Sequence, residues 1–226
     1  MSNFFITGTG TEVGKTLISA AICHQLTMAG KVVQPLKPVL SGFEENNVDS
    51  SDSGILLSSI GSKITKENFL KVTPWCFKAP LSPDMAAERE NRSINFNKLI
   101  QFTLNKSDSA DILIVEGVGG AMVPLDSKHT VMDWISNVDM PAILVAGSYL
   151  GTISHTLTTL EAMKSYGISI KGLIISESPE SPVSLEELVI TIRRYVSNLP
   201  IFVVPRLPDI PKNWEKAPDL ISFLNL

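Results

Sequence analysis

A glycine-bounded loop near the start of the chain ends in a lysine and a threonine, residue types that proteins use to hold phosphate. It reads Gly8-Thr9-Gly10-Thr11-Glu12-Val13-Gly14-Lys15-Thr16. Glycines let backbone N–H groups approach phosphate oxygens, and the N-terminus of a following helix adds partial positive charge. In such a loop Lys15 reaches the β- and γ-phosphates and the Thr16 hydroxyl lies on Mg²⁺. The loop therefore predicts that the chain binds a nucleoside triphosphate together with magnesium.

The context of this loop supports the same interpretation. An apolar run precedes the loop, and a helical pattern of apolar residues follows it at Leu17, Ile18, Ala21, Ile22 and Leu26. The spacing departs from the usual G-x-x-x-x-G-K-[ST], because Thr9 stands where the first glycine is expected and Gly8 comes one residue earlier. Strand, loop and helix nevertheless occur in the order that phosphate binding requires.

A glutamate at the end of a long apolar run is the second candidate for chemistry. The segment reads Asp111-Ile112-Leu113-Ile114-Val115-Glu116-Gly117-Val118-Gly119-Gly120. A continuous apolar run of this kind predicts a buried parallel strand, with Glu116 at its tip. Mg²⁺ takes oxygen ligands and keeps several waters, so Glu116 suits a place beside Thr16. Asp52, in the polar stretch 43–53, is a further candidate ligand, although acids in polar loops are commonly just solvated.

A second lysine follows the next expected strand. The stretch 32–36 is apolar enough for a strand, and its proline at position 35 places that strand at an edge of the sheet. Lys37 comes directly after it, and the Ser41 hydroxyl lies within the same turn. Two lysines at one edge suit a reaction in which an anionic nucleophile attacks the γ-phosphate. The alternative is that Lys37 is a solvated surface lysine.

Strands alternating with helices must bring these residues together. The apolar runs predict strands at 4–8, 32–36, 111–116, 141–146, 170–175 and 201–204, whereas residues 62–108 show no strong alternating pattern. Ser184 and Glu187 form a capping box ahead of a helix, either Ser51 or Asp52 caps a short helix, and further helical patterns begin near Pro83 and Ile94. We expect an α/β fold over residues 1–226: a single-domain, doubly wound, mainly parallel sheet with helices on both faces. Ligands of such sheets bind beyond the carboxyl ends of the strands.

The composition of the chain argues against some classes of binding partner. The 226 residues include 19 lysines and arginines against 23 aspartates and glutamates, and the formal net charge is −4. No basic run indicates nucleic-acid binding, and no apolar stretch approaches the roughly 18 residues of a membrane span. The first residues do not read as a secretory signal, and two cysteines make neither a disulfide framework nor a zinc site. We expect a soluble, cytoplasmic protein with neither a nucleic-acid nor a membrane partner.

Several motifs, in order along nearly the whole chain, resemble those of the dethiobiotin synthetase family, which has a fold of the P-loop NTPase type. They are the phosphate loop 7–16, Lys37-Pro38-Val39-Leu40-Ser41-Gly42, Ser51-Asp52, Ser82-Pro83, Glu116-Gly117-Val118-Gly119-Gly120, Pro124-Leu125 and Leu150-Gly151. The resemblance implies a homodimeric, Mg²⁺- and ATP-dependent ligase that closes a ureido ring on 7,8-diaminononanoate with CO₂ or bicarbonate. Its products would be dethiobiotin, ADP and phosphate, formed through a carbamate and a carbamic–phosphoric anhydride.

The resemblance also implies roles for individual residues. Lys37 and Lys15 would be catalytic, Lys37 holding the carbamate and Lys15 stabilising the transferred phosphoryl group. Thr16, Asp52 and Glu116 would place Mg²⁺. Substrate would contact Thr11, Lys37, Ser41 and, from the neighbouring subunit, Leu150, Gly151, Thr152, Ile153 and Ser154. The nucleotide would contact Glu12, Val13, Gly14, Lys15, Thr16, Leu17, Asp52, Glu116, Gly117, Val118, Gly119, Ser176, Glu177, Pro205, Arg206 and Leu207.

The chain departs from the family pattern at three places. Gly10 stands where the family often has Asp, and Ser154 stands where Asn is usual. Ser176-Glu177 replaces an Asn-Asp pair that reads adenine, and a serine offers one rotatable hydroxyl where asparagine offers both a donor and an acceptor. We therefore expect Ser176→Asn to increase the preference for ATP over other nucleoside triphosphates.

Three other functions fit parts of the sequence. A nucleotide switch of the chromosome-partitioning or septum-placement type shares the fold, but it carries a lysine in the loop where this chain has Gly10. An amide-forming ligase acting on larger acids has no obvious use for Lys37 and Ser41. A diverged relative that binds nucleotide without ligating is suggested by Gly10, Ser154 and Ser176.

Overall fold

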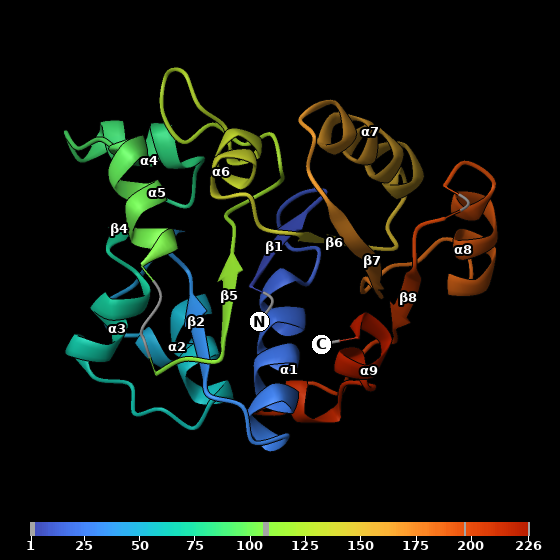
Figure 1. Cartoon of the computed structure of the whole chain (residues 1–226), viewed down its shortest axis with the longest axis horizontal. Coiled ribbons are helices and arrows are strands. Elements are labelled where there is room, and N and C mark those ends of the chain that lie inside the picture. Colours follow the sequence, from blue (N-terminus) through green and yellow to red (C-terminus); the bar gives the residue numbers. More distant parts are fainter. Residues whose placement is uncertain (1–2, 106–108, 197, 226) are drawn as a thin grey trace.

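The computed structural model describes residues 3–105, 109–196 and 198–225, which form a parallel sheet between layers of helices (Figure 1). In this part of the chain the main sheet has six strands in the order β2-β5-β1-β6-β7-β8, and every neighbouring pair is parallel. The strands are β1 (Phe4–Gly8), β2 (Val33–Leu36), β5 (Ile112–Glu116), β6 (Ala142–Ala146), β7 (Ile170–Ser176) and β8 (Ile201–Val204). The predicted doubly wound, mainly parallel sheet is confirmed.

Strand β2 lies at an edge of this sheet, as its proline predicts. Proline has no N–H to donate to a ladder, so a strand that contains it fits best where a neighbour is needed on one side only. Pro35 stands opposite Ile114 of β5, and β5 pairs on its other side with β1. The continuous apolar run of β5 follows from this central place, because helices cover both faces of the sheet.

Helices connect the strands, and their ends carry recognisable caps. They are α1 (Lys15–Met28), α2 (Asp52–Ser59), α3 (Lys66–Val72), α4 (Pro83–Arg89), α5 (Phe96–Leu104), α6 (Val131–Val138), α7 (Thr152–Ser165), α8 (Leu185–Arg193) and α9 (Leu220–Leu224). The capping box at the start of α8 is confirmed, and Ser51 rather than Asp52 caps α2 by accepting from the Gly54 N–H. Asp52 is thereby free to face the site. Within the described residues, no helix is long and apolar enough to cross a membrane.

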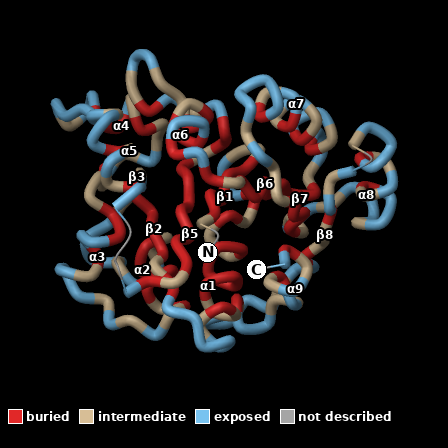
Figure 2. Tube along the Cα trace, viewed as in Figure 1, coloured by how far each residue is buried: buried red, intermediate tan, exposed pale blue. Residues whose placement is uncertain are grey.

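Alternate residues of each strand enter different core clusters. In β1, Phe5 belongs to the cluster under helices α4 to α8, whereas Phe4 and Ile6 belong to the cluster under α1 and α9. The same alternation places Leu144 on one face of β6 and Ile143 on the other. Figure 2 shows the strands as a continuous buried region, with exposed residues along the outer helices. The sheet is therefore fixed in place from both sides.

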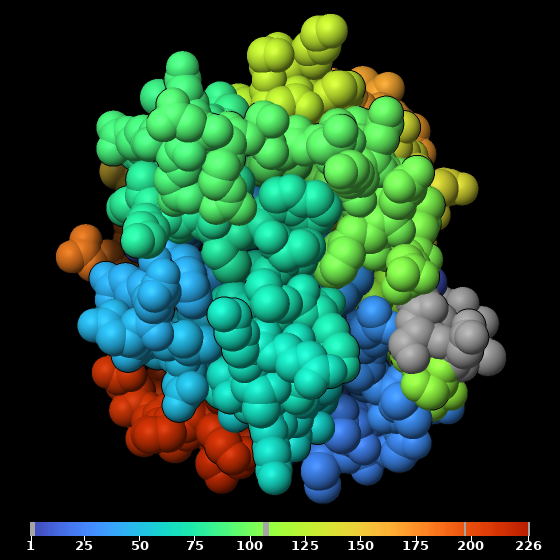
Figure 3. All heavy atoms as spheres, turned by 90° about the vertical axis from the view of Figure 1, so that its left-hand side faces the viewer, coloured from blue at the N-terminus to red at the C-terminus, as the bar shows by residue number. Residues whose placement is uncertain are grey.

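A second, two-stranded sheet lies outside the main one. It joins β3 (Val39–Ser41) to β4 (Trp75–Phe77) in parallel register. These strands were not predicted, because three residues are too few to show an alternating pattern. Helix α3 precedes β4, and Figure 3 shows it in teal at the centre of the face that it covers. The small sheet matters for function because β3 carries Ser41 and begins two residues after Lys37.

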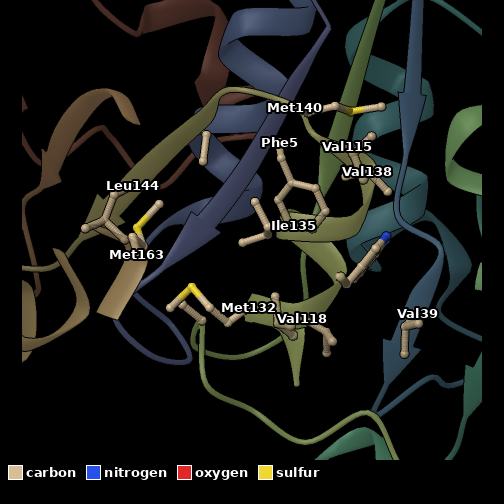
Figure 4. Close-up of a cluster of buried hydrophobic side chains, with 14 of the residues drawn as sticks. Phe5, Val39, Val115, Val118, Met132, Ile135, Val138, Met140, Leu144 and Met163 are labelled. Carbon is tan, nitrogen blue, oxygen red and sulfur yellow. The ribbon is translucent and has the colours of Figure 1, made fainter. Parts of the chain in front are cut away.

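An aromatic pair anchors one face of the main sheet. The rings of Phe5 and Trp134 meet edge to face, with centroids 4.8 Å apart and an interplanar angle of 89°. Trp134 Nε1 donates to Thr103 Oγ1 at 3.0 Å, so the buried indole N–H is paired. Figure 4 shows Phe5 among side chains of the same cluster, including Ile135 and Val138 of α6. This packing fixes α6 on β1 and β5, the strands that lead into the phosphate loop and Glu116.

Truncation of a buried side chain in β6 should lower the stability of the protein. We expect Ile143→Ala, at a fully buried position of β6, to lower the free energy of unfolding by about 2–5 kcal/mol, and Ile143→Val by about 1 kcal/mol. Ile190→Ala on α8, where the side chain is half-exposed, should change it by less than about 0.5 kcal/mol. Urea unfolding monitored by circular dichroism measures all three, and equal losses at the two isoleucines would contradict the assignment of the core.

Candidate active site

A cavity of about 630 Å³ collects residues that follow β1, β2, β3, β4 and β5. Its position obeys the rule that ligands of open parallel sheets bind beyond the carboxyl ends of the strands. The predicted residues that line it are Thr11, Glu12, Gly14, Lys15, Thr16, Leu17, Lys37, Ser41, Asp52, Val118 and Gly119. The structure thus brings together most of the phosphate loop, both lysines and one of the two candidate metal carboxylates at the wall of a single cavity.

The phosphate loop turns on a glycine in the left-handed region. Gly14 has φ of 93° at the start of α1, and a Cβ there would lie 2.5 Å from the Ser176 hydroxyl oxygen. Two features therefore exclude a side chain at position 14: the positive φ angle and the close approach of Ser176. Because glycine also cannot cap the helix with a side chain, the first N–H groups of α1 are left for an anion.

Neighbouring strands brace the other end of the loop. The Thr9 N–H donates to Val145 O at 3.0 Å, and the Ala121 N–H donates to Gly8 O at 2.9 Å. Gly120 packs directly on the loop, since a Cβ at that position would lie 3.2 Å from the Gly10 Cα. The glycines that follow Glu116 therefore let the segment after β5 lie against the phosphate loop.

Three side-chain oxygens from different elements converge at the start of α1. The Thr16 hydroxyl lies 2.9 Å from Asp52 Oδ1 and 2.9 Å from Glu116 Oε1. Glu116 is fully buried, and its second oxygen, Oε2, has no hydrogen-bond partner among the described residues. The described residues contain no cluster of three or more His, Cys, Asp or Glu side chains that could hold a metal. Two carboxylates and a hydroxyl still fit Mg²⁺, which keeps waters and takes phosphate oxygens.

Lys37 is the centre of a buried charge cluster. Its Nζ lies 2.6 Å from Glu116 Oε1 and 2.8 Å from Asp52 Oδ2, and it donates to Gly117 O at 2.8 Å. The residue is only 2% exposed. A lysine in these surroundings is not a solvated surface residue, so the alternative that the sequence left open is excluded.

The protonation states in this cluster follow from its charges. Burial acts to lower the pKa of Lys37, but the Asp52 and Glu116 carboxylates outweigh it and hold that pKa above its ordinary value. Burial likewise acts to raise the pKa of Asp52, whereas the Lys37 charge and hydrogen bonds from Lys37 and Thr16 lower it below its usual range. Lys37 is therefore a cation and Asp52 an anion in the folded protein at neutral pH.

Lys15 has a different environment. Its Nζ donates to Gly10 O at 2.7 Å, and 7% of the residue is exposed. Burial, and to a smaller extent the nearby Lys37 charge, lower the pKa of Lys15 to about 8, although the Glu116 and Asp52 carboxylates act in the opposite direction. The two lysines thus compete for the same carboxylates, and Lys37 makes the direct contacts.

Five predicted nucleotide contacts lie outside this cavity, at the ends of β7 and β8. Ser176 is buried against Gly14, and the Glu177 carboxylate accepts the Arg206 N–H at 2.7 Å, which joins the loop after β7 to the loop 205–207. These residues therefore flank the end of the phosphate loop rather than line the cavity. Val13, Glu116 and Gly117 also lie behind the cavity wall, Gly117 in contact with Lys37.

The predicted carboxylate contacts at 150–154 form the start of α7, away from the chain's own cavity. Gly151 has φ of 96°, and Thr152 Oγ1 donates to Gly147 O at 2.6 Å. Leu150 is 85% exposed. A second cavity, of about 500 Å³, lies between α7 and the phosphate loop and shares Thr11 with the first.

Sequence reasoning missed part of the cavity wall. Pro80 and Leu81 close one side after β4, and the remaining additions are Leu40, Ser82, Pro83 and Val123. The available signal was the proline-rich run 79–83, which directly follows a strand too short to be recognised. Apolar lining of this kind excludes water from the reacting groups.

Comparison with known proteins assigns the family. A family model described as an AAA domain matches residues 2–215. The chain is 44% identical over 202 residues to the ATP-dependent dethiobiotin synthetase BioD of Acidiphilium cryptum, covering 88% of this chain and 91% of that protein. It is 34% identical over 213 residues to the protein of the same name from Bacillus subtilis strain 168, covering 94% and 90%. The chain belongs to the dethiobiotin synthetase family. Its motifs are thus family motifs, as the sequence predicted.

Solved structures agree on the fold. The cell division ATPase MinD of Pyrococcus furiosus superposes with a TM-score of 0.53 at 15% identity, over 96% of this chain and 88% of that one. McdA from Cyanthece gives 0.54 at 13% identity, over 100% and 97%. At such low identity these likenesses show that this chain shares the fold of these proteins, and nothing about activity.

The buried Lys15 should make stability depend on pH. Between pH 8 and 10.5 its ammonium has lost its proton in the folded protein but keeps it in the unfolded chain, so its contribution to the free energy of unfolding rises with pH. We expect this rise to disappear in Lys15→Met and to persist in Lys71→Met, where the lysine is exposed. Urea unfolding of the three proteins across this pH range measures the effect, and parallel pH profiles would contradict the burial of Lys15.

Proposed function

We propose that the protein is a dethiobiotin synthetase that uses ATP and CO₂ to close a ureido ring on 7,8-diaminononanoate, with ADP and phosphate as the other products. The observation that carries this proposal is Lys37, a buried cation that shares one cavity with the phosphate loop and contacts both candidate metal carboxylates. A protein that only holds or hydrolyses nucleotide has no evident need for a second buried cation beside the phosphate-loop lysine.

The phosphate loop would bind the triphosphate. The left-handed turn at Gly14 aims the first N–H groups of α1 at an anion, and Lys15 lies in the same wall. Lys15 donates to the Gly10 carbonyl, and a phosphate oxygen is a stronger partner for an ammonium. Charge on the transferring phosphoryl group would be stabilised by these fixed donors.

Thr16, Asp52 and Glu116 would hold Mg²⁺. The atoms that would contact the ion are all oxygens, and the three residues come from different elements. Oε2 of the buried Glu116 has no hydrogen-bond partner among the described residues, and a cation would satisfy it. When bound there, Mg²⁺ supplies positive charge next to the β- and γ-phosphate oxygens. If both carboxylates contacted the metal, their hold on Lys37 would weaken and its ammonium would be able to turn toward substrate.

Lys37 would hold the reacting carbamate. One amine of the diamine adds to CO₂ with loss of a proton, and a carbamate oxygen then bonds to the γ-phosphorus as the bond from phosphorus to ADP breaks. The second amine attacks the carbamate carbon, the bond to phosphate breaks, and a proton leaves with ring closure. Lys37 neutralises the carbamate as it approaches an anionic phosphate, which lowers the electrostatic barrier. Thr11 and Ser41 share the cavity and can orient the amines.

We propose further that the enzyme is a cytoplasmic homodimer. The start of α7 lies outside the chain's own cavity, and Leu150 is exposed there. A second copy could bring these N–H groups to the carboxylate of the diamine.

The adenine base of the nucleotide would lie at the end of the phosphate loop. The loops joined by Glu177 and Arg206 flank this end.

The activity is tested by following phosphate and dethiobiotin together. With ATP, Mg²⁺ and bicarbonate, phosphate release should require 7,8-diaminononanoate and match dethiobiotin, measured by mass, one for one. A chelator should abolish both. Phosphate release that is indifferent to the diamine would contradict the proposal and favour a nucleotide switch, whereas nucleotide binding without turnover would favour a diverged relative.

Substitution of Lys37 should affect the rate of the reaction much more than the affinity for ATP. We expect Lys37→Ala to lower kcat by about 100-fold or more, because its charge acts on the reacting groups, while ATP affinity changes by only about threefold. Lys71→Ala, which removes an exposed ion pair with Glu67, is the matched control and should leave both unchanged. Calorimetry and steady-state kinetics give the two quantities. Weaker ATP binding with an unchanged kcat would refute this role.

A further inference from the structure

Two buried hydroxyl groups join the first turn of α2 to the residue that follows α3. Ser53 Oγ and Thr73 Oγ1 lie 2.5 Å apart, and both residues are fully buried. Ser53 is the neighbour of Asp52 in the chain, and Thr73 is the C-cap of α3. Neither residue lines the cavity, so the pair acts on the site through its neighbours.

The same segment also holds the backbone of Lys37. The Lys37 N–H donates to Val72 O at 3.2 Å, and the Trp75 N–H donates to Pro38 O at 3.1 Å. Beyond these bonds the two segments continue as β3 and β4, where Ser41 stands opposite Phe77. Residues 72–77 therefore support Lys37 and Ser41 through backbone bonds and Asp52 through the Ser53–Thr73 contact.

The first turn of α2 is held from its other side as well. Gly54 approaches the 3₁₀ segment Val48–Ser50 so closely that an added Cβ would collide with Val48 O. Ser51 caps the helix, and its hydroxyl also donates to Val48 O at 2.6 Å. Asp52 thus projects from a turn that is fixed by the 3₁₀ segment on one side and by Thr73 on the other.

We propose that Thr73 is a positioning residue that sets the Asp52 carboxylate at the distance from Thr16 and Lys37 that Mg²⁺–nucleotide binding requires. The inference rests on the proposed function of this cavity. Asp52 lies 2.9 Å from the Thr16 hydroxyl and 2.8 Å from Lys37 Nζ, and such contacts tolerate little displacement. Groups that orient metal ligands typically change metal affinity by 10- to 100-fold when they are removed.

The test is the Mg²⁺ dependence of ADP binding, measured by calorimetry on the full chain. We expect Thr73→Val, which keeps the shape and removes the hydroxyl, to raise the Mg²⁺ concentration for half-maximal binding by about tenfold or more. Ser53→Ala, a milder change, should act in the same direction. Thr73→Ser keeps a hydroxyl and should restore most of the wild-type Mg²⁺ dependence.

A double variant separates positioning from general stability. Ser53→Ala with Thr73→Val removes both hydroxyls, so no unpaired group stays buried and the thermal midpoint should recover relative to Thr73→Val. The Mg²⁺ concentration for half-maximal ADP binding should stay raised, because the contact between α2 and residue 73 is still absent. A double variant in which both recover would overturn the proposal and leave the pair a merely structural role.

Thr103→Val is the matched control, because Thr103 is equally buried and its hydroxyl accepts from Trp134 between α5 and α6, where neither residue lines the cavity. It should lower the thermal midpoint and leave Mg²⁺ dependence unchanged. Wild-type Mg²⁺ dependence in Thr73→Val would refute the positioning role while the nucleotide site stands. An unmodified protein that binds ADP without any response to Mg²⁺ would refute the site itself, and the role of Thr73 with it.

Discussion

The burial of one ammonium and one carboxylate in direct contact is the constraint on which this site depends. Lys37 and Glu116 are both shielded from water, and their direct contact at 2.6 Å, together with the contact between Lys37 and Asp52, offsets the hydration that each group loses on burial. The pair therefore requires β2 and β5 to be neighbours with their carboxyl ends level, and it requires α2 to bring Asp52 to the same point. The strand order makes β2 and β5 neighbours, Pro35 suits β2 to the edge of the sheet, and the Ser51 cap fixes the start of α2 next to Asp52.

A second consequence is that most groups of the site already contact one another. The carboxylates already face the start of α1, and the Thr16 hydroxyl lies between them. Lys15 is the exception, since it is buried close to a like charge and contacts only a backbone carbonyl there. An anionic phosphate would relieve that repulsion, which makes Lys15 the part of the site that gains most from ligand binding.

Much of this was predictable from sequence, for physical reasons that differ between elements. The six main strands are apolar runs of sufficient length, and the phosphate loop and the tip of β5 carry motifs whose residue types have a chemical cause. The ion pair between Lys37 and Glu116 was not predictable, because it joins residues 79 positions apart in the sequence. The small sheet and the Ser53–Thr73 contact likewise rest on tertiary packing of very short segments. Sequence placed Ser176 at the nucleotide through the family resemblance, whereas its packing against Gly14 depends on the register of β7.

The coupling between Lys37 and Glu116 is the physical claim that holds the site together, and a double-mutant cycle measures it directly. Free energies of unfolding are compared for the unmodified protein, Lys37→Met, Glu116→Gln and the double variant. A buried pair predicts a coupling of about 2 kcal/mol or more, because each single change removes a buried contact partner of the group that is left. The exposed pair Lys71 and Glu67 provides the reference, with about 0.5 kcal/mol or less. Additive single changes at Lys37 and Glu116 would contradict the buried charge cluster.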